Sequence, residues 1–340
     1  MKNILLYGAL LVTSTILVSS SGSTLAQNRR RTSAMRPAST LLSRLPTSDV
    51  VALVKVRRVL YEALPKLFAD NSAKLAEVNR QIEDFKTRTG LDPRDFDELA
   101  LGMTYSYPSE GVTKINTLVL AKGNFSAGAL VAAGRAAPNG KYREQKYQGR
   151  IVYIFTLDQQ VRLLGLMDVT VRELAVCPLD GNTLALGDVL SVRRGVDAIK
   201  GSGRANAELI ALASQDSTAV LGFGGNTPPA VLSNLRIGND AIAKDLAAVR
   251  QVYGSLGMTD KDLQMLVAAR TINADSARNL SETVEGLKAF GGLFINRLPA
   301  AKGALAKSAL GNLKITTQGN ELQIRTAVAQ AEIAPLVGGF

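Results

Sequence analysis

The chain has 340 residues, 46% of them hydrophobic, and a formal net charge of +11 at pH 7. Its length and apolar fraction suit two globular domains of ordinary size, and its positive charge favours anionic partners or surfaces. It contains no His and a single Cys, which excludes histidine-ligated metal sites, Ser-His and Cys-His catalysis, and any intramolecular disulfide.

Residues 1–26 have the pattern of a secretory signal peptide. Lys2 supplies the positive end, Ile4–Val18 the apolar run, and Thr24–Ala26 a small-residue cleavage site. The run is shorter than the roughly 20 residues that a membrane-spanning helix needs, and no Cys lies close behind it to carry a lipid. We therefore expect a periplasmic or secreted mature chain with no membrane span; the alternative is that the segment is kept as an anchor.

Residues 27–46 are predicted to form a basic flexible linker, because they combine Arg29–Arg31 and Arg36 with Pro, Ser and Thr and lack apolar periodicity. These arginines can be a solvated tether. They can also contact anionic lipid head groups or a cell-wall polymer, with about 1 kcal/mol per basic residue near such a surface. The sequence leaves both interpretations open.

Residues 47–200 are predicted to form a first α+β unit. The expected elements are a strand over Asp49–Val56, a helix over Arg57–Thr89 that breaks at Pro65 and restarts at Ser72, strands over Glu98–Ser106 and Ile115–Ala121, a helix from Ser126 to Ala137, hairpins over Lys141–Thr156 and Arg172–Leu186, and a helix over Ser191–Lys200. The helix after Ser72 is expected to bury an apolar stripe made of Leu75, Val78, Ile82 and Phe85.

Gly201–Gly203 is the predicted boundary, and residues 206–340 are predicted to form a second α+β unit. The expected elements are a strand over Ser217–Phe223, a loop over Gly224–Thr227, a helix from Pro228 towards Leu256 with a break near Gly238, a strand over Asp262–Thr271, a helix over Asp275–Phe290, and a hairpin of Leu313–Thr317 with Glu321–Thr326.

A short stretch recurs between the two units. Gly90–Leu99 returns as Gly257–Leu266, since 257 minus 90 is 167. In each copy we expect a glycine that ends a helix, a turn capped by Asp92 or Thr259, and an outgoing strand. The sequence therefore predicts two pseudo-equivalent units, each a mainly antiparallel sheet with helices packed on one face.

Two motifs of possible chemical interest have structural explanations. Gly222–Gly225 lies between a strand and a helix, as in phosphate-binding loops, but Thr227 replaces the third glycine and no Gly-Lys-[Ser/Thr] follows. We favour a turn without ligand, and no cofactor is predicted. Cys177 ends an apolar strand and is expected to be a buried, inert thiol.

The densest acidic cluster consists of Asp92, Asp95, Asp97 and Glu98. Paired carboxylates can hold a metal ion or act as general acid and base. Capping of the turn accounts for the first two, and the second copy has Thr259 in place of Asp92. We therefore expect no metal or catalytic site here.

The strongest candidate for binding is a basic, tyrosine-containing hairpin. Alternation along its first strand places Lys141, Arg143 and Tyr147 on one face and Tyr142 and Lys146 on the other. Rings among cations suit sugars, anionic polymers or single-stranded nucleic acid, although export makes nucleic acid an unlikely partner. The alternative is a solvated hairpin with no ligand. The candidate ligand-binding residues are Lys141, Tyr142, Arg143, Lys146, Tyr147 and Arg150.

A signal peptide, the strand Asp49–Val54 and a capped Gly90–Asp95 turn before a strand make a layout that resembles families of exported bacterial proteins of unknown function built from paired α+β units. The resemblance implies a fold but no activity and no site residue. We expect a non-enzymatic envelope protein that binds an anionic polymer, a lipid surface or a partner protein. The alternative is a periplasmic hydrolase whose carboxylates come from the Asp92–Glu98 region.

Overall fold

The computed structural model describes residues 40–89, 92–109, 112–136, 141–163, 167–228, 240–295 and 300–333. The predicted signal peptide and residues 27–39 of the predicted linker lie outside these ranges. So do Gly90 and the predicted break near Gly238.

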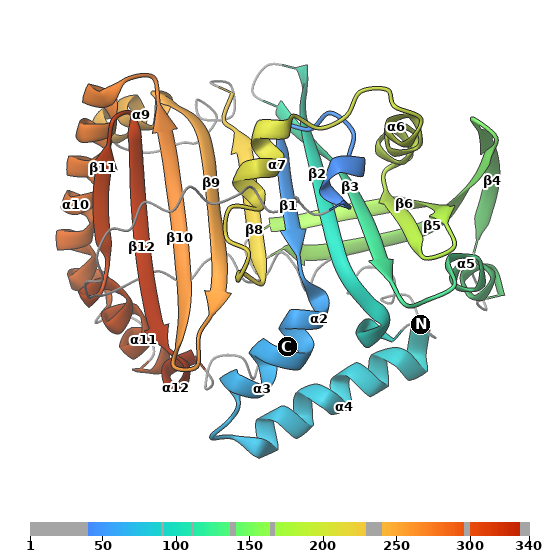
Figure 1. Cartoon of the computed structure of the whole chain (residues 1–340), viewed down its shortest axis with the longest axis horizontal. Helices are drawn as coiled ribbons and strands as arrows, with labels where there is room; N and C mark the ends of the chain where they lie inside the picture. The colour runs from blue at the N-terminus through green and yellow to red at the C-terminus, as the bar shows by residue number, and fades with distance from the viewer. Residues whose placement is uncertain are drawn as a thin grey trace.

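A single sheet of 12 strands, all paired antiparallel, runs across the molecule in the order β11-β12-β10-β9-β8-β1-β2-β3-β7-β6-β5-β4 (Figure 1). The chain therefore has a mixed α+β fold built on one large antiparallel sheet. On one side of the centre lie β1 (Val50–Val54), β2 (Phe96–Ser109), β3 (Val112–Gly123), β7 (Thr183–Gly187), β6 (Met167–Asp180), β5 (Arg150–Leu163) and β4 (Tyr142–Tyr147). On the other lie β8 (Leu221–Asn226), β9 (Val249–Met258), β10 (Asp262–Thr271), β12 (Glu321–Ala329) and β11 (Lys314–Gln318).

Three short helices cover the middle of one face: the 3-10 helix η1 (Leu42–Arg44), α6 (Val189–Ile199) and α7 (Ala207–Ala213) (Figure 1). They bury Leu42, Val192 and Leu209 in one cluster with alternate residues of the strands beneath. This face remains open over β10, β12 and β11, where no helix lies in front of the strands in Figure 1.

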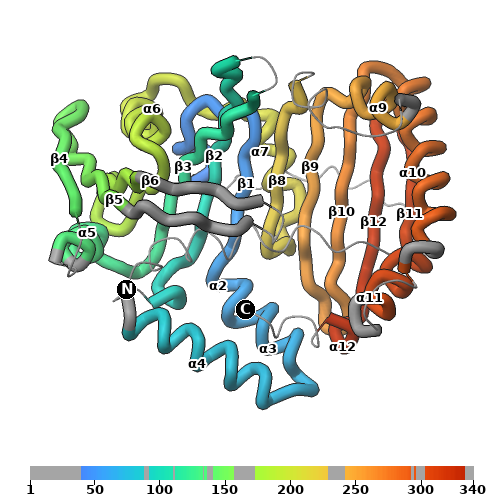
Figure 2. The backbone as a smooth tube through the Cα atoms, turned by 180° about the vertical axis from the view of Figure 1, so that it is seen from behind, coloured from blue at the N-terminus to red at the C-terminus, as the bar shows by residue number. Residues whose placement is uncertain are grey.

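The opposite face is covered at its two ends (Figure 2). There α5 (Ala127–Ala136) packs on β6 at one end, and α9 (Asp240–Ala247) and α10 (Ala274–Ile295) lie behind β9 to β12 at the other. The remaining helical segments are α2 (Val56–Arg58), the π-helix η2 (Val59–Ala63), α3 (Leu64–Leu67), α4 (Ser72–Thr89), the 3-10 helix η3 (Pro93–Asp95), α11 (Ala300–Gly311) and α12 (Gln330–Ile333).

Most strands and hairpins agree with the sequence prediction. The β4–β5 turn has positive φ at Gln148 and Gly149, the conformation that a two-residue hairpin loop requires. The β11–β12 turn likewise has a positive φ at Gly319. Turn chemistry therefore located these hairpins.

The predicted helix towards Leu256 is wrong over its second half. The chain leaves α9 at Ala247 and forms β9, which pairs with β8 on one side and β10 on the other. Apolar residues at 246, 249, 253 and 256 have a helix-like spacing, but strand pairing on both sides outweighs this local preference. Gly257 consequently lies within a strand and ends no helix.

Two further predictions need correction. Residues 40–46 are not linker, because Leu41, Leu42 and Leu45 are fully buried and Ala205 N–H donates to the Leu45 carbonyl at 3.0 Å. The apolar stripe of α4 is only half-buried, since this helix lies beyond the end of the sheet (Figure 1).

Candidate functional site

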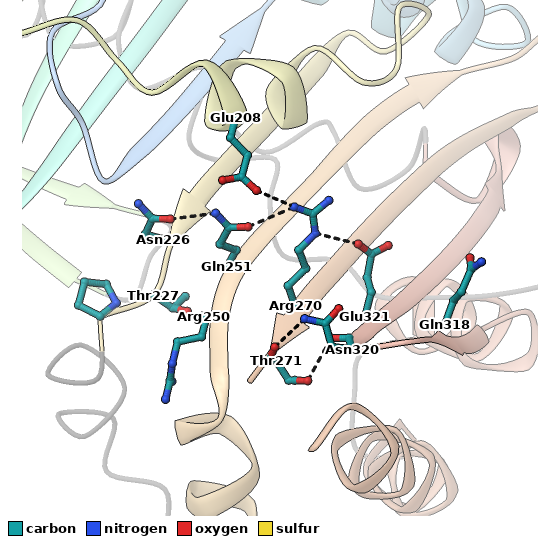
Figure 3. A pocket seen from close by; sticks show the side chains of 11 residues that line it. Glu208, Asn226, Thr227, Arg250, Gln251, Arg270, Thr271, Gln318, Asn320 and Glu321 are labelled. Carbon is teal, nitrogen blue, oxygen red and sulfur yellow. Dashed lines mark hydrogen bonds and ion pairs between the residues drawn. The ribbon is translucent and has the colours of Figure 1, made fainter. Parts of the chain in front are cut away.

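One row of polar side chains crosses five neighbouring strands on the face of the sheet that carries α7 (Figure 3). Each residue is the direct cross-strand partner of the next, from β8 through β9, β10 and β12 to β11. The row consists of Asn226, Gln251, Arg270, Glu321 and Gln318. Antiparallel register thus brings together residues that span more than ninety positions of the chain.

Arg270 is the centre of the row. Its Nη1 donates to Gln251 at 3.2 Å and to Glu208 of α7 at 2.9 Å, and its Nε donates to Glu321 Oε2 at 3.0 Å. Gln251 Nε2 in turn donates to Asn226 Oδ1 at 3.2 Å. The network places the guanidinium between two carboxylates and links these side chains to one another.

Tyr253 supports this network from below. Its side chain is buried, with the guanidinium of Arg270 5.5 Å from the ring centroid, and its hydroxyl donates to Glu321 Oε1 at 2.6 Å. Burial and the hydrogen bond to Glu321 raise the pKa of Tyr253 to about 12. Burial alone would raise the pKa of Glu321, but hydrogen bonds from Tyr253, Gln323 and Arg270 outweigh it and lower that pKa. Glu321 therefore stays ionised at neutral pH.

The row forms the floor of a hollow of about 820 Å³. Glu208, Arg270 and Glu321 contribute charges, and the exposed Arg250 adds another at the rim. Two arginines and two glutamates give a net charge of zero. The hollow can therefore offer hydrogen bonds without an overall electrostatic preference for anions.

Most side chains of the predicted hairpin site contact other residues of the same chain. Arg143 pairs with Glu173, with contacts of 2.5 and 3.2 Å to the two carboxylate oxygens, and Arg150 donates to the Pro178 carbonyl at 3.1 Å. The hydrogen bond to Glu173 raises the pKa of Arg143, and the hydrogen bond from Arg143 lowers the pKa of Glu173.

The tyrosines of the hairpin are also engaged. Arg135 of α5 lies 5.4 Å from the Tyr142 ring centroid and donates to its hydroxyl at 3.1 Å. On the opposite face the Tyr147 hydroxyl donates to Asp197 of α6 at 2.7 Å. The predicted alternation of Tyr142 and Tyr147 between two faces is consistent with these contacts, which fasten β4 to the molecule.

The two lysines of the hairpin, Lys141 and Lys146, are exposed. Within the described ranges neither has an ion-pair partner. Of the predicted basic surface only these two cations remain, Lys146 in the edge strand β4 and Lys141 directly before it.

The predicted acidic cluster has structural roles. Asp92 accepts from Arg94 N–H at 2.9 Å at the start of η3 and pairs with Lys86 at 2.9 Å, and Asp97 pairs with Arg57 at 3.6 Å. Burial would raise the pKa of Asp92, but bonds from Arg94 and Lys86 outweigh it and lower that pKa. In the part of the chain that the structure describes, no group of acidic or Cys side chains could hold a metal ion.

The glycine-rich motif is not a loop, because Gly222–Gly225 lies within β8. A side chain at Gly222 would meet the carbonyl oxygen of Ala213 at 2.1 Å, and one at Gly224 would meet that of Leu209 at 2.8 Å. These glycines therefore let α7 pack closely on the strand. Cys177 is buried as predicted, and burial raises its pKa to about 11.

Sequence reasoning missed the polar row. Its residues are isolated polar positions near strand ends, and the sequence pattern around Gln251 predicts a helix where the structure has β9. The available signal was that Arg270 follows the alternate apolar residues Leu266 and Ala268 in its strand, and that Glu321, of opposite charge, begins another strand.

Fold and site define an α+β protein with a large antiparallel sheet and an open, polar hollow whose charged side chains sum to zero. No protein-family model matches the chain, and no curated protein matches it. Among solved structures, it is similar to crystal form III of TP0453 (TM-score 0.46, 9% identity, 88% of this chain and 98% of that chain). It is also similar to crystal forms IV (TM-score 0.43, 9% identity) and I (TM-score 0.42, 10% identity), each covering 88% of this chain and 96% of that chain. Likeness at this level assigns neither a family nor a function.

Among the described residues, no helix combines the length and apolarity needed to cross a membrane.

Proposed function

We propose that the protein is a non-enzymatic, exported protein of the cell envelope that binds its ligand in the hollow around Arg270. The observation that carries this proposal is the row of five polar side chains, one from each of five strands, on a face that α7 covers at β8 and that no described helix covers at β10, β12 and β11. A concave site with converging polar groups is where a binding function is expected. Export rests on the predicted signal peptide.

The state of Glu321 argues against general-acid catalysis in the hollow. Glu321 has a lowered pKa, and Glu208 is held by Arg270 at 2.9 Å. A general acid needs a carboxyl group that keeps its proton near neutral pH. The alternative hydrolase would use the Asp92–Glu98 region, where Asp92 caps η3 and pairs with Lys86. Turnover lost on Asp95→Asn in a folded protein would favour that alternative.

A second candidate is contact with an anionic polymer, a lipid surface or a protein partner through the hairpin. The exposed Lys141 and Lys146 favour it, while the internal pairing of Arg143 and Arg150 weakens it. Residues 29–36 of the predicted linker could make a similar contact.

We also propose that the fold arose by duplication of one unit. From the centre outwards, β1-β2-β3-β7-β6 on one side corresponds in order and connection to β8-β9-β10-β12-β11 on the other. The β4–β5 hairpin is then an addition to the first unit. This correspondence pairs β2 with β9, so it differs from the 167-residue offset, which pairs Leu99 of β2 with Leu266 of β10.

The binding proposal is tested with the mature chain, residues 27–340, passed over immobilised amylose, chitin, heparin and polygalacturonate. We expect retention on at least one matrix. The double variant Asn226→Ala/Gln318→Ala removes the two ends of the row and should weaken retention about tenfold, as expected for two lost hydrogen bonds.

Gln264→Ala is the matched control. Gln264 is an exposed glutamine on the same face of β10, six residues from Arg270, and its loss should not change retention. Circular dichroism verifies the folding of each variant. Retention on none of the matrices, or retention that survives the double variant, would refute the hollow as the binding site.

A further inference from the structure

The charge of the hollow constrains its ligand. Arg250 and Arg270 carry positive charge, and Glu208 and Glu321 carry negative charge. The carboxylates already lie on either side of the Arg270 guanidinium, at 2.9 and 3.0 Å. An anionic ligand would have to approach two carboxylates to reach one guanidinium. The chain as a whole has a net charge of +11, but the charged side chains of this site sum to zero.

The hydrogen-bonding groups left over in the row are mainly donors. Arg270 donates from Nε to Glu321 and from Nη1 to Gln251, and Asn226 accepts through Oδ1 from Gln251. Among the described residues, Arg270 Nη2 and Asn226 Nδ2 therefore have no hydrogen-bond partner. The exposed amide of Gln318 also has no partner among those residues and can donate as well as accept. A ligand that satisfies the row must therefore present several oxygen acceptors together with some donors, which is the pattern of a hydroxyl-rich molecule.

The direction of the row adds a geometric constraint. Neighbouring strands lie about 4.8 Å apart, so the row from Asn226 to Gln318 spans about 19 Å at right angles to the strands. Every strand contributes one polar side chain along this line. Such a site suits an extended polymer whose repeating units are similar in length to the strand spacing, rather than a single small molecule.

We infer that the hollow takes an uncharged saccharide chain that lies across β8, β9, β10, β12 and β11 with its hydroxyl groups against the polar row. The inference rests on the proposed binding function and names its ligand class. Arg270, held rigid by Glu208 and Glu321, is the fixed donor at the centre, and Asn226 and Gln318 are the contacts at the two ends.

The test is isothermal titration of the mature chain with neutral oligosaccharides (maltohexaose, chitohexaose) and with anionic hexagalacturonate, at about 50 mM and about 500 mM salt. We expect binding of a neutral hexamer whose affinity changes less than about twofold with salt, since no net charge is neutralised. Affinity should increase from the disaccharide to the tetrasaccharide, because a longer chain contacts more of the row. Asn226→Ala/Gln318→Ala should reduce it about tenfold, and Gln264→Ala should leave it unchanged.

The outcomes separate the two proposals. If hexagalacturonate alone binds and the double variant abolishes its binding, the hollow is a binding site but the uncharged class is wrong. If anionic binding instead falls steeply with salt and is lost in the Lys141, Arg143, Lys146 and Arg150 to Ser variant, the hairpin is the site and both proposals fail. Binding of no saccharide at either salt concentration overturns the inference, and if no matrix retains the chain either, the hollow is refuted as a binding site as well.

Discussion

At the scale of single residues, the contacts among Arg270, Glu321 and Tyr253 have two effects: they stabilise the charge of Glu321, and they hold the Arg270 side chain in place. Glu321 is a carboxylate whose side chain is only 17% exposed, and a charge so placed is costly unless it is paired and hydrogen-bonded. Arg270, Gln323 and Tyr253 provide those bonds. The same bonds hold Arg270 in place, so rigidity of the site and stability of the fold depend on one carboxylate.

This arrangement predicts a pH dependence. The pKa of Glu321 is lowered from 4.5 in the folded chain, so its contribution to stability is present above pH 4.5 and is lost as pH falls through the folded value. Glu321→Gln should therefore lower the free energy of unfolding by about 1–2 kcal/mol at pH 7 and by clearly less near pH 3. Urea unfolding at the two pH values measures both differences.

Asp275→Asn is the control for that experiment. Asp275 pairs with Arg278 but its side chain is 81% exposed, so its loss should have little effect at either pH. An equal effect of Glu321→Gln at both pH values would contradict the argument.

Residue chemistry was predictable where it is local. The cap at Asp92, the turns at Gly149 and Gly319 and the burial of Cys177 follow from neighbours in sequence. The partners of Arg143 and Tyr147 were not predictable, because Glu173 and Asp197 lie thirty and fifty positions away. For the same reason a basic, aromatic hairpin could be recognised in the sequence, but its internal pairing could not.

At the scale of elements, β8 depends on glycine. Ala213 approaches Gly222 so closely that an added Cβ would lie 2.1 Å from its carbonyl oxygen. Gly222→Ala should therefore push α7 away from the strand and cost about 1–3 kcal/mol, as for an overpacked core. The measurement is the shift of the urea unfolding midpoint.

Gly128→Ala provides the opposite control. Gly128 lies in α5 with nothing within 4 Å of an added Cβ, so alanine should stabilise the chain by about 0.5–1 kcal/mol through helix propensity. A destabilisation of similar size at both glycines would show that close packing of α7 is not what Gly222 provides.

The error at β9 belongs to this scale too. Leu246 and Val249 continue an apolar spacing that a helix would also show, and the sequence offers no turn signal between them. The helix ends there because Val249 pairs with Thr271 and the residues beyond it pair with β8 and β10. Since the row runs through β9 at Gln251, this one misread element also concealed the candidate site.

At the scale of the whole molecule, the sheet is continuous across the predicted boundary at Gly201–Gly203. β1 and β8 pair along their length, from Val50 with Gly225 to Val54 with Leu221. One hydrophobic cluster contains Leu42 and Leu45 from before β1 together with Leu209 and Leu212 of α7. The two predicted units share a sheet and a core, so they are expected to fold together.

This expectation predicts how the chain behaves when it is divided. Fragments 27–203 and 204–340, expressed separately, should aggregate or unfold without cooperativity, because each exposes a central strand edge and part of the shared cluster. A protease site inserted at Gly201–Gly203 in the folded chain should instead give a nicked protein that elutes at full mass, since the pairing of β1 with β8 and the shared cluster are already formed. Size-exclusion chromatography and thermal unfolding distinguish the two states. Cooperative unfolding of an isolated fragment would contradict this prediction, because that fragment would be a domain that is stable alone. The β1–β8 pairing and the shared cluster would then contribute to the association of domains rather than to their folding.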